Sequence, residues 1–149
     1  MRAVVQRAIE ARVEVAGEVT GRIGQGLVAF VGAEKNDTQT DLDYVVSKVL
    51  GLRVFPDENG KMTRALADVG GGLLVISQFT VFGDVRRGLR PSFDGAMEPV
   101  GAEALYDRFV EAARKSGVPV ETGRFRADMR VFVENDGPVT ILVDSRRLF

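Results

Sequence analysis

Residues 70–80 read GGGLLVISQFT, and this stretch contains both a strand signal and a break in that signal. The apolar run Leu73–Ile76 follows three glycines and is typical of a strand buried in a core. Ser77, Gln78 and Thr80 follow at once, and polar groups buried without partners cost stability. The strand end therefore indicates a ligand site, although an isolated Ser and Thr pair is explained more simply by hydrogen bonds to neighbouring backbone.

Further strands are predicted on both sides of this stretch. Leu27–Val31 is a continuous apolar run closed by glycine, which is typical of a strand buried on both faces. Alternating or apolar patterns predict other strands at residues 13–15, 19–23, 130–133 and 139–143. Pro56–Gly60 reads as a turn between them.

Two segments change to the period of a helix. Residues 38–52 carry apolar side chains at i, i+3, i+4 and i+7, namely Leu42, Val45, Val46 and Val49, and Gly51 indicates the end of this helix. A second helix is predicted between Pro99 and Gly117. About seven or eight strands with two helices predict an α+β fold, mainly antiparallel, in one domain covering residues 1–149.

The composition excludes several kinds of catalytic site. The chain has no cysteine and no histidine, so Ser-His-Asp, Cys-His and HExxH chemistry are all excluded. Hydroxyls, carboxylates, amines, backbone amides, an all-oxygen metal site or a group of the substrate remain. The net charge is −1, which is unlike the polycations that bind nucleic acids through overall charge. No apolar run approaches the roughly 18 to 20 residues of a membrane helix and no signal peptide is evident, so we expect a cytoplasmic protein.

A second polar interruption is NDGPVT at residues 135–140, between two apolar runs. A turn joining two strands is its ordinary interpretation. A cis bond precedes only about 5 to 6% of prolines in folded proteins, so the residues alone do not predict one before Pro138.

A basic loop, RRGLRPSF, spans residues 86–93. It brings together Arg86, Arg87 and Arg90, and guanidinium groups bind phosphate in a bidentate manner. A solvated surface loop is an equally good interpretation. A second basic group, Arg124, Arg126 and Arg130, is a weak signal by itself.

Taken together and in this order, these segments resemble the D-aminoacyl-tRNA deacylase family of bacteria and eukaryotes. The matching residues extend over the whole chain and are 5–7, 26–27, 77–80, 86–93, 105–109, 122–125, 127–129 and 135–140. Two places depart from the family pattern. Arg126 stands where the family usually has glycine, and residues 63–66 stand where it has a Ser-bearing stretch. The role of Arg126 is open.

The resemblance implies a barrel-like α+β fold and a homodimer whose active site lies at the dimer interface. It implies hydrolysis of the ester at the acceptor 3′ end of D-aminoacyl-tRNA, and of glycine mischarged on tRNA-Ala, releasing the amino acid and free tRNA. It implies no cofactor, metal, membrane or DNA partner.

The same resemblance assigns roles to residues. Ser77, Gln78, Phe79 and Thr80 would form the catalytic segment, with the Phe79 N–H as an oxyanion donor and the ribose 2′-hydroxyl of the tRNA as a participant. Because a threonine nucleophile needs a base, we expect Thr80 to position the substrate rather than attack it.

The resemblance also implies a gate that excludes L-amino acids by steric hindrance. A cis Gly137–Pro138 bond would enter the partner's site, and Arg7 would hold this loop. The substrate-binding residues would be Asn135, Met129, Phe125, Ala127, Gly137 and Pro138. Arg86, Arg87 and Arg90 would contact tRNA phosphates.

Three other functions are compatible with the same residues. The chain could be a non-enzymatic RNA-binding module that uses the same arginines, or a hydrolase of another D-amino acid derivative. A relative that clears L-alanine from mischarged tRNA is the third, but the match at residues 135–138 favours the D-specific type.

Overall fold

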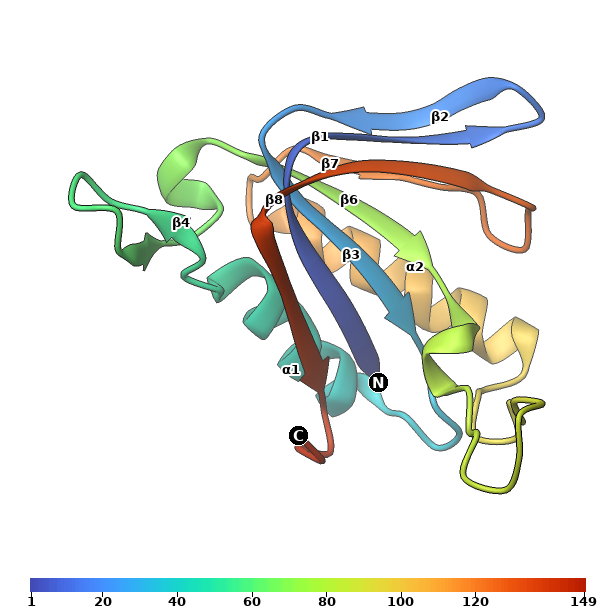
Figure 1. Ribbon diagram of the computed structural model, residues 1–149. Helices are drawn as coiled ribbons and strands as arrows, with labels where there is room; N and C mark the ends of the chain where they lie inside the picture. Colours follow the sequence, from blue (N-terminus) through green and yellow to red (C-terminus); the bar gives the residue numbers. More distant parts are fainter.

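The computed structural model describes all residues 1–149 and contains a bent mixed sheet with two main helices (Figure 1). Its strands are β1 Arg2–Val15, β2 Glu18–Ile23, β3 Gly26–Gly32, β4 Phe55–Pro56, β5 Met62–Arg64, β6 Gly72–Ser77, β7 Val120–Thr122 and β8 Arg130–Asp144. The helices are α1 Gln39–Gly51 and α2 Pro99–Lys115, with the short 3-10 helices η1 Ala67–Val69 and η2 Phe79–Phe82.

The main sheet is organised around β1. Its order is β2-β1-β3-β6-β7, and β8 also pairs with β1. β1 is antiparallel to β2, β3 and β8, whereas β3 pairs with β6 and β6 with β7 in parallel. The α+β prediction is confirmed, and the sheet is mixed rather than purely antiparallel. The parallel strands β3 and β6 are the two continuous apolar runs, as expected for strands covered on both faces.

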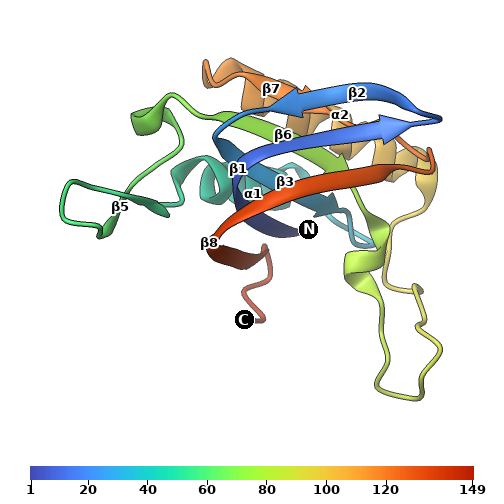
Figure 2. The same ribbon diagram turned by 45° about the horizontal axis from the view of Figure 1, so that its top comes forward.

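The two ends of the sheet approach each other, which gives it a barrel-like bend (Figure 2). A side chain at Gly21 of β2 would place its Cβ 2.5 Å from the Thr122 carbonyl oxygen of β7 and 3.2 Å from Leu74. Glycine is therefore required where β2 passes over β7.

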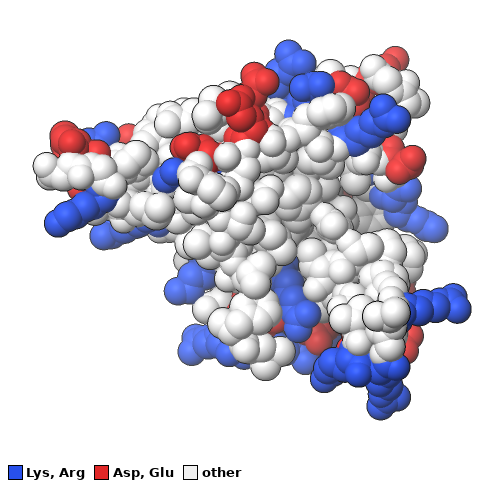
Figure 3. Space-filling view, in the orientation of Figure 1, with Lys and Arg blue, Asp and Glu red and all other residues white.

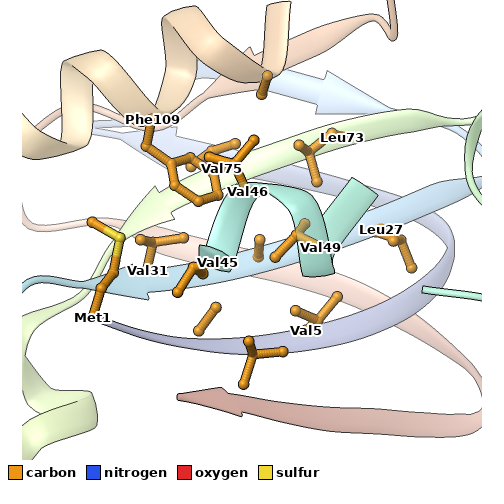
Figure 4. Close-up of a cluster of buried hydrophobic side chains, with 14 of the residues drawn as sticks. Met1, Val5, Leu27, Val31, Val45, Val46, Val49, Leu73, Val75 and Phe109 are labelled. Carbon is orange, nitrogen blue, oxygen red and sulfur yellow. The ribbon is translucent and has the colours of Figure 1, made fainter. Parts of the chain in front are cut away.

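The larger hydrophobic core lies between the sheet and both helices (Figure 4). All four apolar positions predicted for the first helix are buried in α1, and α2 contributes Leu105, Phe109 and Ala113. A smaller cluster fills the other face of the sheet and includes Val13, Val28 and Ile76.

The helix ends follow local chemistry. The Asp41 carboxylate accepts hydrogen bonds from the Thr38 N–H and hydroxyl, both at 2.9 Å, at the start of α1. The Glu98 carboxylate accepts from the N–H groups of Val100 and Gly101 at the start of α2. The predicted helices at residues 38–52 and 99–117 are confirmed.

One strand prediction is wrong. Residues 130–133 and 139–143 were expected to be two strands joined by a turn, but both belong to β8, because both pair with the single long strand β1. β1 itself begins at Arg2, well before the predicted residues 13–15. None of the helices is long and apolar enough to cross a membrane.

Candidate active site

The polar segment at the end of β6 leaves the core and turns along an open edge. Ser77 is the last residue of β6 and pairs with Val31 of β3. The Gln78 N–H donates to the Val31 carbonyl at 2.8 Å, and η2 begins at the next residue. Phe79 is the first residue of η2, and the first N–H groups of a helix have no partner within it.

Two side chains of this segment form a hydrogen bond with each other, and a third packs against an aromatic ring outside the segment. The Gln78 side-chain amide donates to the Thr80 hydroxyl at 2.8 Å. The Phe79 ring is 55% exposed and packs edge-on against Phe93, with ring centroids 5.0 Å apart. The hydroxyl of Thr80 therefore has an amide neighbour rather than a base.

A cavity of about 540 Å³ opens beside this segment. Ser77, Gln78, Phe79 and Thr80 all line it, and 12 of its 18 lining residues are hydrophobic. The C-terminal end of β3 and the N-terminal half of α2 form two of its walls. Such a cavity binds a largely apolar group and has few polar contacts to orient it.

The loop between β7 and β8 forms a further wall, which includes Phe125, Ala127 and Met129. The Gly123 N–H donates to the Val75 carbonyl at 3.2 Å, which fastens this loop to β6. Arg126, which departs from the family pattern, also lines the cavity and has a φ of 60°. Segments almost fifty residues apart in the chain thus meet at one site.

Tyr106 of α2 supports the cavity from behind. Its hydroxyl donates to the Val75 carbonyl at 2.9 Å, and its ring lies 6.0 Å from that of Phe125. Burial, together with the nearby Asp107, raises the pKa of Tyr106 to about 12. The phenol is therefore neutral at physiological pH and holds the wall in place.

Gly137 and Pro138 lie outside the lining of this cavity, and the peptide bond between them is cis. They belong to a bulge in β8. Gln6 pairs with Thr140 and Ala8 pairs with Asn135, so Arg7 of β1 alone faces residues 136–139 of β8. Gly137 and Pro138 are exposed on this bulge.

Two side chains hold the bulge from below. The Asn135 amide donates to the carbonyl oxygens of Arg7, at 2.8 Å, and Val139, at 3.0 Å. The buried Arg7 guanidinium pairs with Asp136 at 2.9 Å and donates to the Val54 carbonyl. The tip of the bulge is thus presented on a rigid base.

The basic loop between η2 and α2 is closed by paired backbone hydrogen bonds between Asp84 and Ser92. Basic side chains, drawn blue at the lower right of Figure 3, gather over this loop. The three arginines differ, because Arg86 contacts Asp84 through two bonds of 2.9 and 2.6 Å. The Arg86 side chain and N–H hold the pKa of Asp84 well below its usual value. Arg87 and Arg90 are exposed and form no ion pair.

Some lining residues were not predicted as site residues. Phe93 and Tyr106 fall inside segments that carried the family resemblance, which was the signal that could have identified them. Met1 and Met97 had no such signal, because nothing local distinguishes them from core methionines. The chain has no group of three or more acidic side chains placed to hold a metal ion.

The family model described as D-Tyr-tRNA(Tyr) deacylase matches residues 4–144. A D-aminoacyl-tRNA deacylase of Sorangium cellulosum is 75% identical over 150 residues and covers all of both chains. A D-aminoacyl-tRNA deacylase of Thermotoga petrophila is 55% identical over 149 residues, again with 100% of both chains covered.

Two solved structures are similar to this fold. One, named c-Myc DNA Unwinding Element Binding Protein, superposes with a TM-score of 0.91 at 41% identity and covers 97% of this chain and 98% of its own. Another is described as a probable eukaryotic D-amino acid tRNA deacylase. It superposes with a TM-score of 0.81 at 18% identity, and the match covers 96% of this chain and 98% of the other. At that identity the second likeness concerns the fold alone.

Proposed function

Because this chain belongs to the D-Tyr-tRNA(Tyr) deacylase family and is a hydrolase of D-aminoacyl-tRNA, we propose that the cavity beside Ser77–Thr80 holds the ester bond. The observation that carries the proposal is the convergence of this segment with Phe125–Met129 around one cavity. Water attacks the ester carbonyl, and the products are the D-amino acid and free tRNA. Family membership excludes the alternative of a non-enzymatic RNA-binding module.

The catalytic groups are proposed to be backbone and substrate rather than an acid-base pair. The Phe79 N–H stabilises the oxyanion, because a donor at the open start of a helix is available to developing negative charge. Ser77 and Gln78 position the ester. The ribose 2′-hydroxyl of the tRNA takes part in the reaction, since no carboxylate side chain lines the cavity.

Thr80 is proposed to position substrate rather than attack it. Its hydroxyl accepts a hydrogen bond from the Gln78 amide, which cannot remove a proton from it. A hydroxyl nucleophile needs a neighbouring base.

Chiral selection is proposed to come from a second copy of the chain. In a homodimer, Gly137 and Pro138 of one protomer enter the cavity of its partner and occupy the space of an L side chain. The exposed position of both residues, outside their own cavity, supports this arrangement. Glycine has no side chain to exclude, so glycyl-tRNA is also a substrate.

The tRNA is proposed to contact Arg87 and Arg90 near its acceptor end, with Arg86 partly occupied by Asp84. The similar structure that is named for binding DNA has a sheet of the same form, but the substrate proposed for this chain is RNA. A cytoplasmic location follows from that substrate. The chain is proposed to act as one domain, residues 1–149.

The decisive experiment measures hydrolysis of D-Tyr-tRNA, L-Tyr-tRNA and Gly-tRNA by purified protein in the presence of a chelator. We expect the D and glycyl esters to be cleaved and the L ester to persist. Equal rates for the D and L esters would contradict chiral selection. Loss of all activity in chelator would contradict a reaction without metal.

A further inference from the structure

We propose that Arg126 forms a phosphate-binding subsite at the rim of the cavity and thereby sets the direction in which the substrate lies. The inference rests on the proposed function, because the phosphate is the one on the terminal nucleotide that carries the ester. Arg126 thereby orients the substrate, and the residue that departs from the family pattern gains a function.

Arg126 brings a positive charge to the lining of the cavity. Arg126 is the only charged side chain among the 18 residues that line the cavity. The α-ammonium group of Met1, which also lines the cavity, is ion-paired with the buried Asp37 at 2.7 Å. Arg126 therefore contributes the only unpaired charge to the lining of the cavity within one protomer.

The Arg126 guanidinium is free to bind a ligand. Arg126 is exposed and takes part in none of the nine ion pairs of the chain. Other arginines, such as Arg12 and Arg64, are paired with carboxylates near them in the chain. An unpaired guanidinium offers five donors in a geometry that suits phosphate.

The backbone at Arg126 forms a tight turn beside the cavity. The Ala127 N–H donates to the Arg124 carbonyl at 3.2 Å, so Phe125 and Arg126 are the central residues of a turn. Arg126 adopts a φ of 60°, a conformation that disfavours residues with a β-carbon. The turn places Phe125 and Arg126 at the cavity together, one as an apolar wall and the other as a charge.

These features determine the direction in which the substrate lies in the cavity. An aminoacyl nucleotide carries a negative phosphate at one end and an α-amino group that takes up a proton near neutral pH at the other. Arg126 attracts the first and repels the second. The terminal phosphate therefore lies at the Arg126 rim, and the amino group points away from it.

The test uses two stable amide analogues, 3′-deoxy-3′-(D-tyrosylamino)adenosine and its 5′-phosphate, as inhibitors of D-Tyr-tRNA hydrolysis. For the wild-type enzyme we expect the phosphate form to have the lower inhibition constant. In Arg126→Gln this constant should rise about tenfold to a hundredfold, as expected for a lost hydrogen bond to a charged group. The constant for the analogue without phosphate should not change, and Arg126→Lys should recover part of the loss.

Arg124→Gln is the matched control, because Arg124 is an exposed arginine of the same loop that does not line the cavity. It should alter neither inhibition constant. Equal inhibition of the wild-type enzyme by both analogues would overturn the subsite, as would an Arg126→Gln enzyme that still prefers the phosphate form. In both outcomes the wild-type enzyme still hydrolyses D-Tyr-tRNA, so the proposed function stands. A wild-type protein that does not hydrolyse D-Tyr-tRNA would instead overturn the proposed function, and the subsite with it.

Discussion

Gln78 and Thr80 bond to each other at the point where a catalytic site would usually hold a base. The Gln78 amide donates to the Thr80 hydroxyl at 2.8 Å, and the cavity beside them has no carboxylate side chain. A tRNA ester is already activated toward hydrolysis, so an oxyanion donor and a well-oriented substrate can provide much of the catalysis. Under the proposed mechanism, the side chains of this site act mainly by positioning the substrate.

Replacing Thr80 tests that view. Thr80→Ala should lower the single-turnover rate of D-Tyr-tRNA hydrolysis by less than about tenfold, because only one positioning contact is lost. Thr80→Ser is the control that keeps the hydroxyl. A loss of about a thousandfold or more in Thr80→Ala, restored in Thr80→Ser, would show that the hydroxyl is the nucleophile.

At the scale of elements, the close approach of β3 and β6 positions the segment Ser77–Thr80. Gly26 pairs with Gly72 where these parallel strands begin, and Val31 pairs with Ser77 where they end. A β-carbon on Gly26 would lie 1.9 Å from the Gly72 carbonyl oxygen. Glycine at the start of this strand pair therefore permits the close approach of β3 and β6, at whose other end Ser77 lies beside the cavity.

Gly26→Ala should consequently separate β3 from β6 and destabilise the fold by about 3 kcal/mol or more, since the contact is with backbone that cannot move aside. Urea unfolding measures this change. Gly24→Ala, two residues earlier in the connection between β2 and β3, is the matched control, because a β-carbon there meets nothing within 4 Å. Similar unfolding midpoints for the two variants would contradict the packing argument.

The Asp41 carboxylate at the start of α1 should make the stability of the fold sensitive to acid. Burial alone would raise the pKa of Asp41, but hydrogen bonds from Thr38 and Ser145 outweigh it and lower the pKa from 3.8 to about 2. Because the folded pKa is below the unfolded one, this stabilisation is present above about pH 4 and is lost as the pH falls toward 2.

In Asp41→Asn the free energy of unfolding should therefore fall less steeply between pH 4 and pH 2 than in the wild type. At neutral pH the variant should be less stable. Urea unfolding across this range provides the measurement. Curves that run parallel for the two proteins would show that Asp41 does not contribute to the acid sensitivity.

At the scale of the whole molecule, the bulge of β8 and the cavity are separate features of one chain. Gly137 and Pro138 are exposed, and neither lines the cavity formed by their own protomer. Arg7 and Asn135 hold them on a rigid base. A gate that acts on a partner's site needs this kind of support.

Hybrid dimers distinguish a gate that acts on the partner from one that acts on its own chain. A Pro138→Ala enzyme should hydrolyse L-Tyr-tRNA. Excess Ser77→Ala/Gln78→Ala protein has an intact gate, and we expect it to be much less active because both positioning side chains are lost. It should suppress this L activity by forming hybrids while D-Tyr-tRNA hydrolysis continues. L activity that is unaffected by the excess would show that each gate serves its own chain.

The basic loop predicts how tRNA binding responds to salt. Each phosphate contact contributes roughly 0.7 to 0.9 to the slope of log K against log salt concentration, so Arg87→Gln/Arg90→Gln should reduce the slope by about 1.5. Arg86→Gln should have a smaller effect, because Asp84 already pairs with Arg86. An unchanged slope in the double variant would assign the loop to the solvated surface.

Local periodicity was sufficient for part of this molecule. The spacing of Leu42, Val45, Val46 and Val49 predicted α1 and its buried face, because helix geometry places i, i+3, i+4 and i+7 on one side. The apolar runs of β3 and β6 predicted strands covered on both faces. The order of the short motifs along the chain was sufficient to identify the family.

Long-range pairing decided the rest. Residues 130–144 look like two strands and a turn, and only their common partner β1 makes them one strand with a bulge. Sequence could not show that Arg126 is the only charged side chain at the cavity, because the lining comes from segments whose approach depends on the whole sheet. Periodicity depends on a residue's near neighbours in the chain, whereas a site of this kind depends on which distant strands pair and in which register.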